Sequence, residues 1–288
     1  AEVAGGRRVE VVEVPERYVA GQETAIINAI ERGKALPRFQ PPRPTTKGLG
    51  GRPTLVSNVE TLARLAIAHH VEVSGGGQVH GAHTMGILGT LWTPRGGNAF
   101  EAQPNETLRH VFARVAGGIP EDSTLMVGGY YGSFVTFDAQ LAETSIGQLG
   151  SRNLSYGAGL LVAFPPDACV VNEADRVISY LGGQSAGQCG PCMFGLPAIA
   201  NEFHLLATGQ GGDLDKIWRW TEQIKGRGAC TMPDGYSLLV RSVIRSRMTE
   251  LKSHAHRSCR AKDYRVMAAA MAPKNPDSRR GLLTHVNR

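Results

Sequence analysis

Apolar and polar residues alternate over residues 9–14, a pattern typical of a β-strand with one buried face. Pro15 interrupts the alternation, and apolar residues then recur at helical spacing. This second pattern predicts a helix over about 22–32 that ends at Gly33. Gly21 therefore lies at a strand-to-helix turn, where backbone N–H groups can hold a phosphate, although an ordinary turn would also explain this glycine.

A proline-rich segment follows over residues 36–54, with five prolines that exclude a helix or a central strand. We expect it to be extended and to lie against another part of the protein, with a disordered linker as the alternative. The next helix is predicted over about 57–70, because Ser57 and Glu60 have the spacing of a capping box. Its expected inward-facing residues are Val59, Leu62, Leu65 and Ala66.

The middle of the chain is rich in predicted strands. Residues 83–138 show strand, turn, strand, helix and strand, an order that predicts a small ubiquitin-like unit. Residues 159–171 form a buried strand that prolines interrupt, with Cys169 as a core residue. The rest is predicted to be helical, over about 172–182, 193–208, 213–225 and 235–256. The fold class is therefore α/β followed by α.

The stretch from Gln184 to Gly195 carries the strongest chemical signal. Cys189 and Cys192 form a Cys-x2-Cys step flanked by glycines, and Cys230 follows in another small-residue context. Thiolates at this spacing can reach one metal centre, and the glycines allow backbone N–H groups to approach the sulfurs. Buried structural cysteines and a redox-active pair are the alternatives. The odd count of five cysteines argues against a disulfide framework.

Composition and charge narrow the function classes. The chain has 288 residues, of which 42% are hydrophobic and 19% charged, with a net charge of +6. This mild charge fits a solvated basic surface or an acidic partner such as a ferredoxin-like protein, and disfavours nucleic acid. No apolar run reaches the about 18–20 residues that cross a bilayer, and no signal peptide is visible, so we expect the reducing cytoplasm. The chain begins with Ala1 rather than Met, which fits a fragment or a processed product.

Four motifs occur in order in the N-terminal part. They are Tyr-x-x-Gly-x-Glu-Thr-Ala from Tyr18, Pro-Arg-x-x-Pro-Pro-x-Pro from Pro37, Lys-Gly-Leu-x-Gly-x-Pro-Thr from Lys47 and Asn-Val-Glu-Thr-Leu from Asn58. With the cysteine region, they resemble the flavin- and NADH-binding 51 kDa (F) subunit of respiratory complex I and the related diaphorase subunits of NAD-linked hydrogenases and formate dehydrogenases. The resemblance runs from about residue 9 to residue 258.

The resemblance implies a division of the chain into four parts. Residues 1–80 would be the C-terminal part of a Rossmann-like flavin- and nucleotide-binding domain, and residues 81–150 a β-grasp domain of the soluble-ligand-binding (SLBB) type. Residues 151–260 would form a helical iron–sulfur domain with a lead-in strand. Residues 261–288 would be a tail.

The family binds a [4Fe–4S] cluster through Cys-x2-Cys-x2-Cys and one later cysteine. Cys189, Cys192 and Cys230 match the second, third and fourth positions, whereas the first falls on Ala186, which cannot ligate. We expect Cys259, at the end of the last predicted helix, to supply the fourth ligand of this metal site.

Three alternatives to this ligand set stay open. The cluster could be held by three cysteines and have an open corner. The metal could be zinc, bound by cysteines alone or with His254 or His256, although these histidines also fit surface positions at a helix C-terminus. The third alternative is that no metal is bound.

The resemblance also implies an FMN site. Its residues in this chain would be Tyr18, Gly21, Glu23, Asn58 and Thr61. The family's Arg-Gly-Gly-x-Gly-Phe loop, which cradles the FMN phosphate, would precede residue 9 and does not occur in these 288 residues. Because this loop is needed for the FMN site, we expect FMN to bind in the complete protein, with the loop present.

Four positions depart from the family near the flavin and the nucleotide. Gln22 replaces a glutamate, and Ser57 replaces a residue that is usually asparagine. Gln40 and Arg43 stand where the family has a lysine and an aromatic residue that contact the nicotinamide nucleotide. Arg43 could grip a phosphate, as NADPH would offer, or lie on the surface, so the use of NADH or NADPH stays open.

The expected function is electron transfer from a flavin, with NADH or NADPH as donor, to an iron–sulfur cluster and then to a ferredoxin-like protein or a larger complex. The chain would be an NAD(P)H dehydrogenase-type oxidoreductase subunit only if its flavin site is complete. It would lie in the cytoplasm or at the inner face of a membrane complex, with no inserted segment. The alternative is a non-catalytic structural subunit with a degenerate flavin site and a structural metal.

Overall fold

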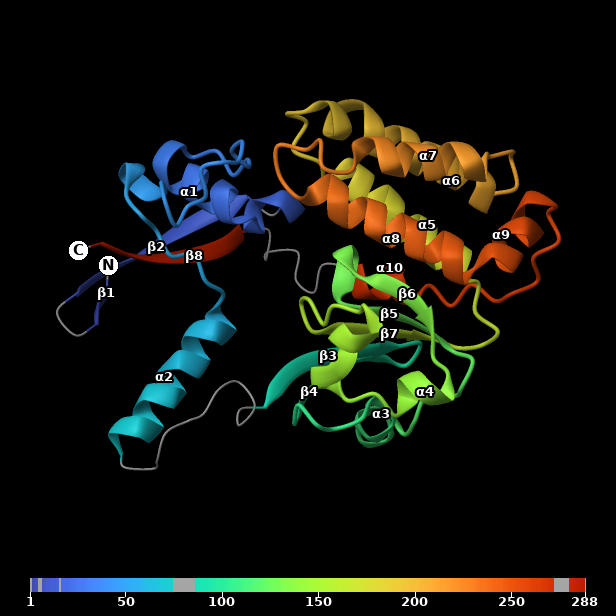
Figure 1. Ribbon diagram of the computed structural model, residues 1–288, viewed down its shortest axis with the longest axis horizontal. Coiled ribbons are helices and arrows are strands. Elements are labelled where there is room, and N and C mark those ends of the chain that lie inside the picture. The colour runs from blue at the N-terminus through green and yellow to red at the C-terminus, as the bar shows by residue number, and fades with distance from the viewer. Residues whose placement is uncertain (1, 5–6, 16, 75–85, 272–279, 288) are drawn as a thin grey trace.

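The structure is a computed structural model that describes residues 2–4, 7–15, 17–74, 86–271 and 280–287. Figure 1 shows a small N-terminal body with α1, β2 and β8 beside a larger body that contains a sheet and most of the helices. The helix α2 projects from the small body. Among the described residues, no helix is both long and apolar enough to cross a membrane.

The N-terminal body contains a three-stranded antiparallel sheet in the order β1-β2-β8. Its strands are β1 (Glu2–Ala4), β2 (Arg7–Pro15) and β8 (Arg280–Asn287). The strand predicted over residues 9–14 is therefore confirmed as part of β2. Residues 280–287, within the segment that the sequence separates as a tail, pair with β2 along its length from Arg8 to Pro15.

The predicted helix after this strand is confirmed as α1 (Glu23–Arg32). Gln22 caps it, because its side-chain oxygen accepts hydrogen bonds from the backbone of Thr24 and Ala25. Gly33 ends the helix at φ 67°, a left-handed conformation that favours glycine. The proline-rich segment contains no α-helix or strand, as predicted, but it is not extended throughout. It turns after Arg43 and at the 3₁₀ turn η2 (Leu49–Gly51), and the Thr54 N–H donates back to the Pro44 carbonyl at 2.9 Å.

The helix α2 (Val59–Val73) differs from its prediction in two ways. Asn58 rather than Ser57 is the N-cap, because its side chain accepts from the backbone of Thr61. The predicted inward face is exposed: Val59 is 82% and Leu65 is 63% exposed, since no described element packs on this face. Two predictions were therefore wrong: that Ser57 caps this helix, and that its apolar face is turned inward.

The larger body is built on a five-stranded sheet in the order β4-β3-β7-β5-β6. The pair β3–β7 is parallel and the other pairs are antiparallel. The strand bounds are β3 (Ile87–Thr93), β4 (Gly96–Ala102), β5 (Thr124–Val127), β6 (Ser133–Thr136) and β7 (Leu160–Phe164). The strand that sequence analysis placed as a lead-in to the helical domain is thus the central strand of this sheet.

Each face of this sheet has its own hydrophobic core. On one face, Leu125 and Leu161 join Phe112 of the helix α3 (Leu108–Ala116) in one buried cluster. On the other face, Met126 and Val162 belong to the cluster that contains the buried helix residues. Successive strand residues point to opposite faces, so a strand covered on both sides is apolar at every position. Figure 1 shows α5 and α8 on one side of the sheet and α3 on the other.

The helical part confirms the predicted helices, with one difference. Its helices are α5 (Val170–Gly183), α6 (Leu196–Ala207), α7 (Leu214–Ile224), α8 (Met232–Ser246), α9 (Met248–Ala255) and α10 (Val266–Met271). The single helix predicted over 235–256 is two helices, α8 and α9, because the backbone at Arg247 leaves the helical conformation. The shorter elements are η1 (Tyr18–Gly21), η4 (Gly129–Tyr131), α4 (Ala139–Ala142), η5 (Ile146–Arg152) and the π-turn η6 (Pro191–Gly195).

Candidate functional site

The loop between α5 and α6 carries the Cys-x2-Cys step. Gly187 in this loop has φ 66°, which allows the chain to turn directly after α5. The π-turn η6 then leads into α6, and Gly195 packs so closely against α7 that an added Cβ would lie 2.4 Å from Ile224 Cγ2. Glycine is therefore required at the turn that presents Cys192.

Cys189, Cys192 and Cys230, here called the cluster triad, influence one another electrostatically. Burial raises the pKa of the Cys192 thiol to about 11, and the neighbouring Cys189 and Cys230 add to this effect. Burial also raises the pKa of Cys230. Metal binding at the cluster triad would replace these protons.

Backbone N–H groups lower the pKa values of two thiols of the cluster triad, in opposition to the effect of burial. The N–H of Ala186 lowers the pKa of Cys192, and the N–H of Met232, at the start of α8, lowers that of Cys230. Both groups favour a negatively charged sulfur, as hydrogen bonds to cluster thiolates do. Ala186 thus takes part through its backbone, although its methyl group cannot bind a metal.

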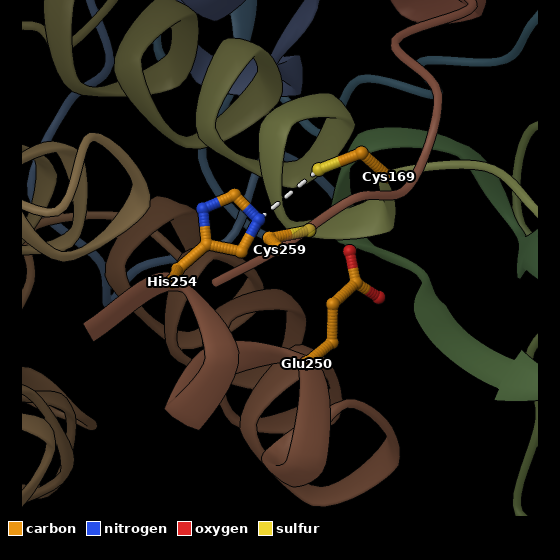
Figure 2. Close-up of side chains that lie close together, drawn as sticks. All are labelled: Cys169, Glu250, His254 and Cys259. Atoms are coloured by element: carbon orange, nitrogen blue, oxygen red, sulfur yellow. Dashed lines mark hydrogen bonds between the residues drawn. The ribbon is translucent and has the colours of Figure 1, made fainter. Parts of the chain in front are cut away.

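Cys259 belongs to a different group of side chains. Its sulfur lies within 4.8 Å of ligand atoms of Cys169, Glu250 and His254, and Figure 2 shows these four residues pointing toward one another. We call this group the Cys169 tetrad. The chain after α9 turns back to pair with residues 167–169, which carries Cys259 to this position. The structure therefore gives no support to Cys259 as the fourth ligand of the cluster triad.

Sequence analysis named Cys259 and His254 as possible metal ligands but did not group them with Cys169 and Glu250. It predicted Cys169 as a core residue, and that residue is indeed 1% exposed. The available signal was Glu250 and His254, four residues apart and hence on one face of a helix, with Cys259 following closely. The position of Cys169, 85 residues before His254, could not be read from spacing.

Tyr18 connects the N-terminal body to the cluster triad. Its backbone N–H donates to Gln184 Oε1 at 3.1 Å, directly before the cysteine loop. Its ring lies 5.1 Å from that of Tyr131 and 5.7 Å from that of Tyr130. Burial raises the pKa of Tyr18 to about 12, so its hydroxyl is neutral at physiological pH.

Tyr131 completes this connection. Burial raises its pKa far above the ordinary value, and Tyr18, Cys230 and Cys192 contribute to the shift. Tyr131 lowers the pKa of Tyr18 while Tyr18 raises that of Tyr131, as expected where the Tyr131 hydroxyl faces that of Tyr18. Tyr131 therefore lies near enough to the predicted flavin residue Tyr18 and to two sulfurs of the cluster triad for all three to affect its pKa.

The structure distributes the other predicted flavin residues over two places. A Cβ added at Gly21 would meet no atom within 4 Å, so the space beside this residue is open. Glu23 accepts a hydrogen bond from Gln40 Nε2 at 2.8 Å. Asn58 and Thr61 are joined in the cap of α2, at 2.8 Å between Asn58 Oδ1 and the backbone nitrogen of Thr61.

The residues present fit an iron–sulfur cluster at three corners. The cluster triad supplies three of the four thiolate donors that such a cluster ordinarily takes, and backbone N–H groups approach two of these sulfurs. The fit to FMN is partial: open space at Gly21 and a helix N-terminus at Asn58 are suitable for a flavin phosphate, whereas Glu23 is held by Gln40.

Comparison with known families gives two matches along the chain. Residues 172–254 match the NADH-ubiquinone oxidoreductase-F iron-sulfur binding region, and residues 1–67 match the Nuo51 FMN-binding domain. The first match includes the whole cluster triad, and the second includes every predicted flavin residue.

Curated relatives are NADH-quinone oxidoreductase F subunits. The subunit of Buchnera aphidicola subsp. Baizongia pistaciae is 32% identical over 234 residues, which are 76% of this chain and 51% of that protein. The subunit of Escherichia coli strain K12 is 32% identical over 215 residues, 70% of this chain and 47% of that protein. The chain thus spans about half the length of the relatives it matches.

A solved structure shares the fold. A chain of the NAD⁺-reducing [NiFe]-hydrogenase in the air-oxidized state superposes with a TM-score of 0.65 at 22% identity, over 83% of this chain and 42% of that one. The two family matches and the curated relatives agree with the four sequence motifs and with the position of the cysteine loop. The chain therefore belongs to the family of the 51 kDa (F) subunit of NADH-quinone oxidoreductase.

Proposed function

We propose that this chain is the electron-exit part of a diaphorase-type subunit, which passes electrons from a flavin to an iron–sulfur cluster and on to a partner protein. One observation carries the proposal: Tyr18 of the proposed flavin-binding region donates its backbone N–H to Gln184, directly before the cysteine loop, and packs its ring 5.1 Å from that of Tyr131, whose pKa the charges of Cys192 and Cys230 raise. This arrangement supports a path between the two proposed cofactor sites through Tyr18 and Tyr131.

The cluster triad would hold the cluster, with Cys189, Cys192 and Cys230 as its thiolate ligands. An iron–sulfur cluster supplies one-electron transfer, and the hydrogen bonds and burial around its sulfurs set its potential. In this chain the backbone N–H groups of Ala186 and Met232 stabilise negative charge on Cys192 and Cys230.

Tyr18, Gly21, Glu23, Asn58 and Thr61 are the proposed flavin-binding residues. FMN supplies the change from two-electron to one-electron transfer when it is bound. Gly21 leaves room for a ligand, Glu23 is oriented by Gln40, and Asn58 with Thr61 forms the N-terminus of α2. We propose NADH or NADPH as the donor, and the exposed Arg43 is the cation available for a nucleotide phosphate.

The unit over residues 86–164 is proposed to be the β-grasp (SLBB-like) domain. The strand order β4-β3-β7-β5-β6, with an opening hairpin, a helix before β5 and a parallel central pair, supports this proposal. The proposed partners are the other subunits of a redox complex, among them a ferredoxin-like protein, on the cytoplasmic side. The net charge of +6 suits an acidic partner surface.

The competing proposal is a structural subunit that has lost redox function. Alanine at position 186 and the replacements at Gln40 and Arg43 favour it, because each removes a group that the family uses. Anaerobic purification of the whole chain, with iron and acid-labile sulfide analysis and EPR spectroscopy, separates the two proposals. A reducible cluster signal with iron and sulfide in the same preparation supports electron transfer. Reconstituted protein without such a signal would exclude it.

A further inference from the structure

We propose that the Cys169 tetrad is a zinc site, separate from the cluster triad. Cys169, Glu250, His254 and Cys259 each offer one ligand atom, and these atoms all lie within 4.8 Å of one another. Two sulfurs, one imidazole nitrogen and one carboxylate oxygen are ligands that zinc takes in four-coordinate sites. Only two thiols are present, which is too few for an iron–sulfur cluster held by cysteines.

His254 is oriented as a metal ligand would be. Its Nδ1 lies 2.6 Å from the carbonyl oxygen of Ala207, at the end of α6. A carbonyl oxygen only accepts, so we assign the ring hydrogen to Nδ1. The lone pair of Nε2 then faces the Cys169 sulfur at 3.1 Å. A backbone carbonyl that fixes the second ring nitrogen is the usual outer contact of a metal-binding histidine.

Glu250 is held in a comparable way. Its Oε1 accepts a hydrogen bond at 3.0 Å from the backbone N–H of Val171, in the first turn of α5. The carboxylate is thus fixed beside Cys169, and Figure 2 shows it directed toward the two sulfurs. Outer contacts of this kind position metal-binding carboxylates.

The four residues of the Cys169 tetrad differ in how deeply they are buried. Cys169 and His254 are buried, whereas Glu250 and Cys259 are half-buried, so one side of the group faces the solvent. An ion could reach the buried sulfur and the imidazole from this side. A metal site needs such an entry path as well as the correct ligands.

The proposed ion would join three segments that are distant in sequence. Cys169 precedes α5, Glu250 and His254 lie on α9, and Cys259 lies in the return segment, defined as residues 257–265. The return segment already contacts the start of α5, because the Cys169 backbone N–H donates to the Lys262 carbonyl at 2.7 Å. A metal ion that bridges these segments would close a long loop and hold α9 and the return segment on α5.

Metal counting on the whole chain tests the proposal. The chain is purified anaerobically with reduced thiols, loaded with iron, sulfide and Zn²⁺, and freed of loosely bound metal by gel filtration. Zinc and iron are then measured in the same sample. We expect about one zinc per chain. The Cys259→Ser variant should lose at least about ten-fold in zinc and keep its iron. The matched Cys189→Ser variant should keep its zinc.

A second variant guards against misfolding of the first. Glu250→Gln keeps the size of the side chain and removes one charged ligand, so zinc affinity should fall at least about ten-fold. Co²⁺ added to the metal-free chain should give a thiolate-to-cobalt charge-transfer band that Cys259→Ser abolishes and Cys189→Ser retains. Zn²⁺ should raise the melting temperature of the metal-free chain by at least about 4 °C.

Several results would overturn the proposal. These are zinc below about a tenth of an equivalent in the loaded chain, zinc that depends on Cys189 instead of Cys259, or iron in place of zinc at the tetrad. A Cys169–Cys259 disulfide, detected by peptide mass mapping of the reduced-thiol preparation, would also overturn it. None of these results depends on whether the cluster triad carries electrons, because iron and zinc are counted separately.

Discussion

The cluster triad and the Cys169 tetrad are two cysteine groups built in different ways. Two members of the cluster triad lie in one glycine-rich loop, and the third precedes α8. The Cys169 tetrad collects its members from the start of α5, from α9 and from the return segment. One group is largely encoded by local sequence, whereas the other exists only after the helices have packed.

This difference has a consequence for stability. The cysteine loop is shaped by its own turns, such as the one at Gly187, and by its packing on α7. The tetrad depends instead on contacts that hold the return segment, among them Lys262 with the backbone of Cys169 and Asp167. Changes at these contacts should therefore affect the tetrad more than the triad.

The largest expected effect is the loss of iron when the cluster triad is broken. Cys192→Ala removes the buried thiol of the triad, so iron retained after anaerobic reconstitution should fall at least about ten-fold, with loss of the EPR signal. Cys169→Ala, which changes the buried thiol of the tetrad, is the matched control and should keep its iron. Equal iron loss in both variants would show that the two groups form one centre.

The next effect concerns the buried carboxylate that holds α10. Glu173 is 0% exposed and accepts the backbone N–H groups of Val266 at 2.8 Å and of Met267 at 3.0 Å. It also pairs with Arg176 at 3.0 Å. Glu173→Gln removes the charge of a fully buried acceptor and leaves Arg176 paired with Asp263 alone, so the free energy of unfolding should fall by about 2–4 kcal/mol in urea titrations.

A surface ion pair provides the control for this prediction. Glu222 pairs with Arg241 and is 48% exposed, so Glu222→Gln should lower the free energy of unfolding by less than about 1 kcal/mol. If the two substitutions destabilise the chain equally, Glu173 does not anchor the segment that follows the tetrad. Zinc retention measured on Glu173→Gln then reports whether the tetrad depends on that anchor.

The sequence predicted the elements well wherever local patterns decided the outcome. The strand over 9–14, the helix ending at Gly33 and the helices around the cysteine loop are all confirmed, since periodicity and end signals are local properties. The prediction that the apolar face of α2 is buried was wrong. An apolar stripe at helical spacing does not show whether another element covers that face.

Long-range arrangement could not be predicted in the same way. The pairing of β8 with β2, the central place of β7 in the sheet and the position of Cys259 all depend on how distant segments pack. The resemblance required a fourth cluster ligand in place of Ala186, and Cys259 was chosen because it was the cysteine still available. Its contact with Cys169 follows from the path of the return segment, which no spacing rule describes.

A smaller effect is expected from restoring the missing cysteine of the cluster triad. Ala186 already directs its backbone N–H at Cys192, so a thiol at this position would lie beside the triad. In Ala186→Cys the iron content after reconstitution should rise from about three to about four per chain, and the cluster should survive air longer. Ala200→Cys, on α6 and outside the loop, is the control and should change neither value. An unchanged iron content in Ala186→Cys would mean that the fourth corner is filled by another ligand.

The smallest predicted effect is a change of cluster potential when the proposed link between the two proposed cofactor sites is altered. Tyr131→Phe keeps the ring that packs against Tyr18 and removes the hydroxyl whose pKa Tyr18, Cys192 and Cys230 raise. Loss of this polar group should shift the midpoint potential of the cluster by about 30–60 mV, measured by EPR-monitored redox titration. Tyr264→Phe, whose hydroxyl donates to Asp167 at 3.0 Å beside the tetrad, should leave the potential unchanged. If both variants shift the potential equally, the hydroxyl acts through overall stability, and Tyr131 has no particular connection with the cluster triad.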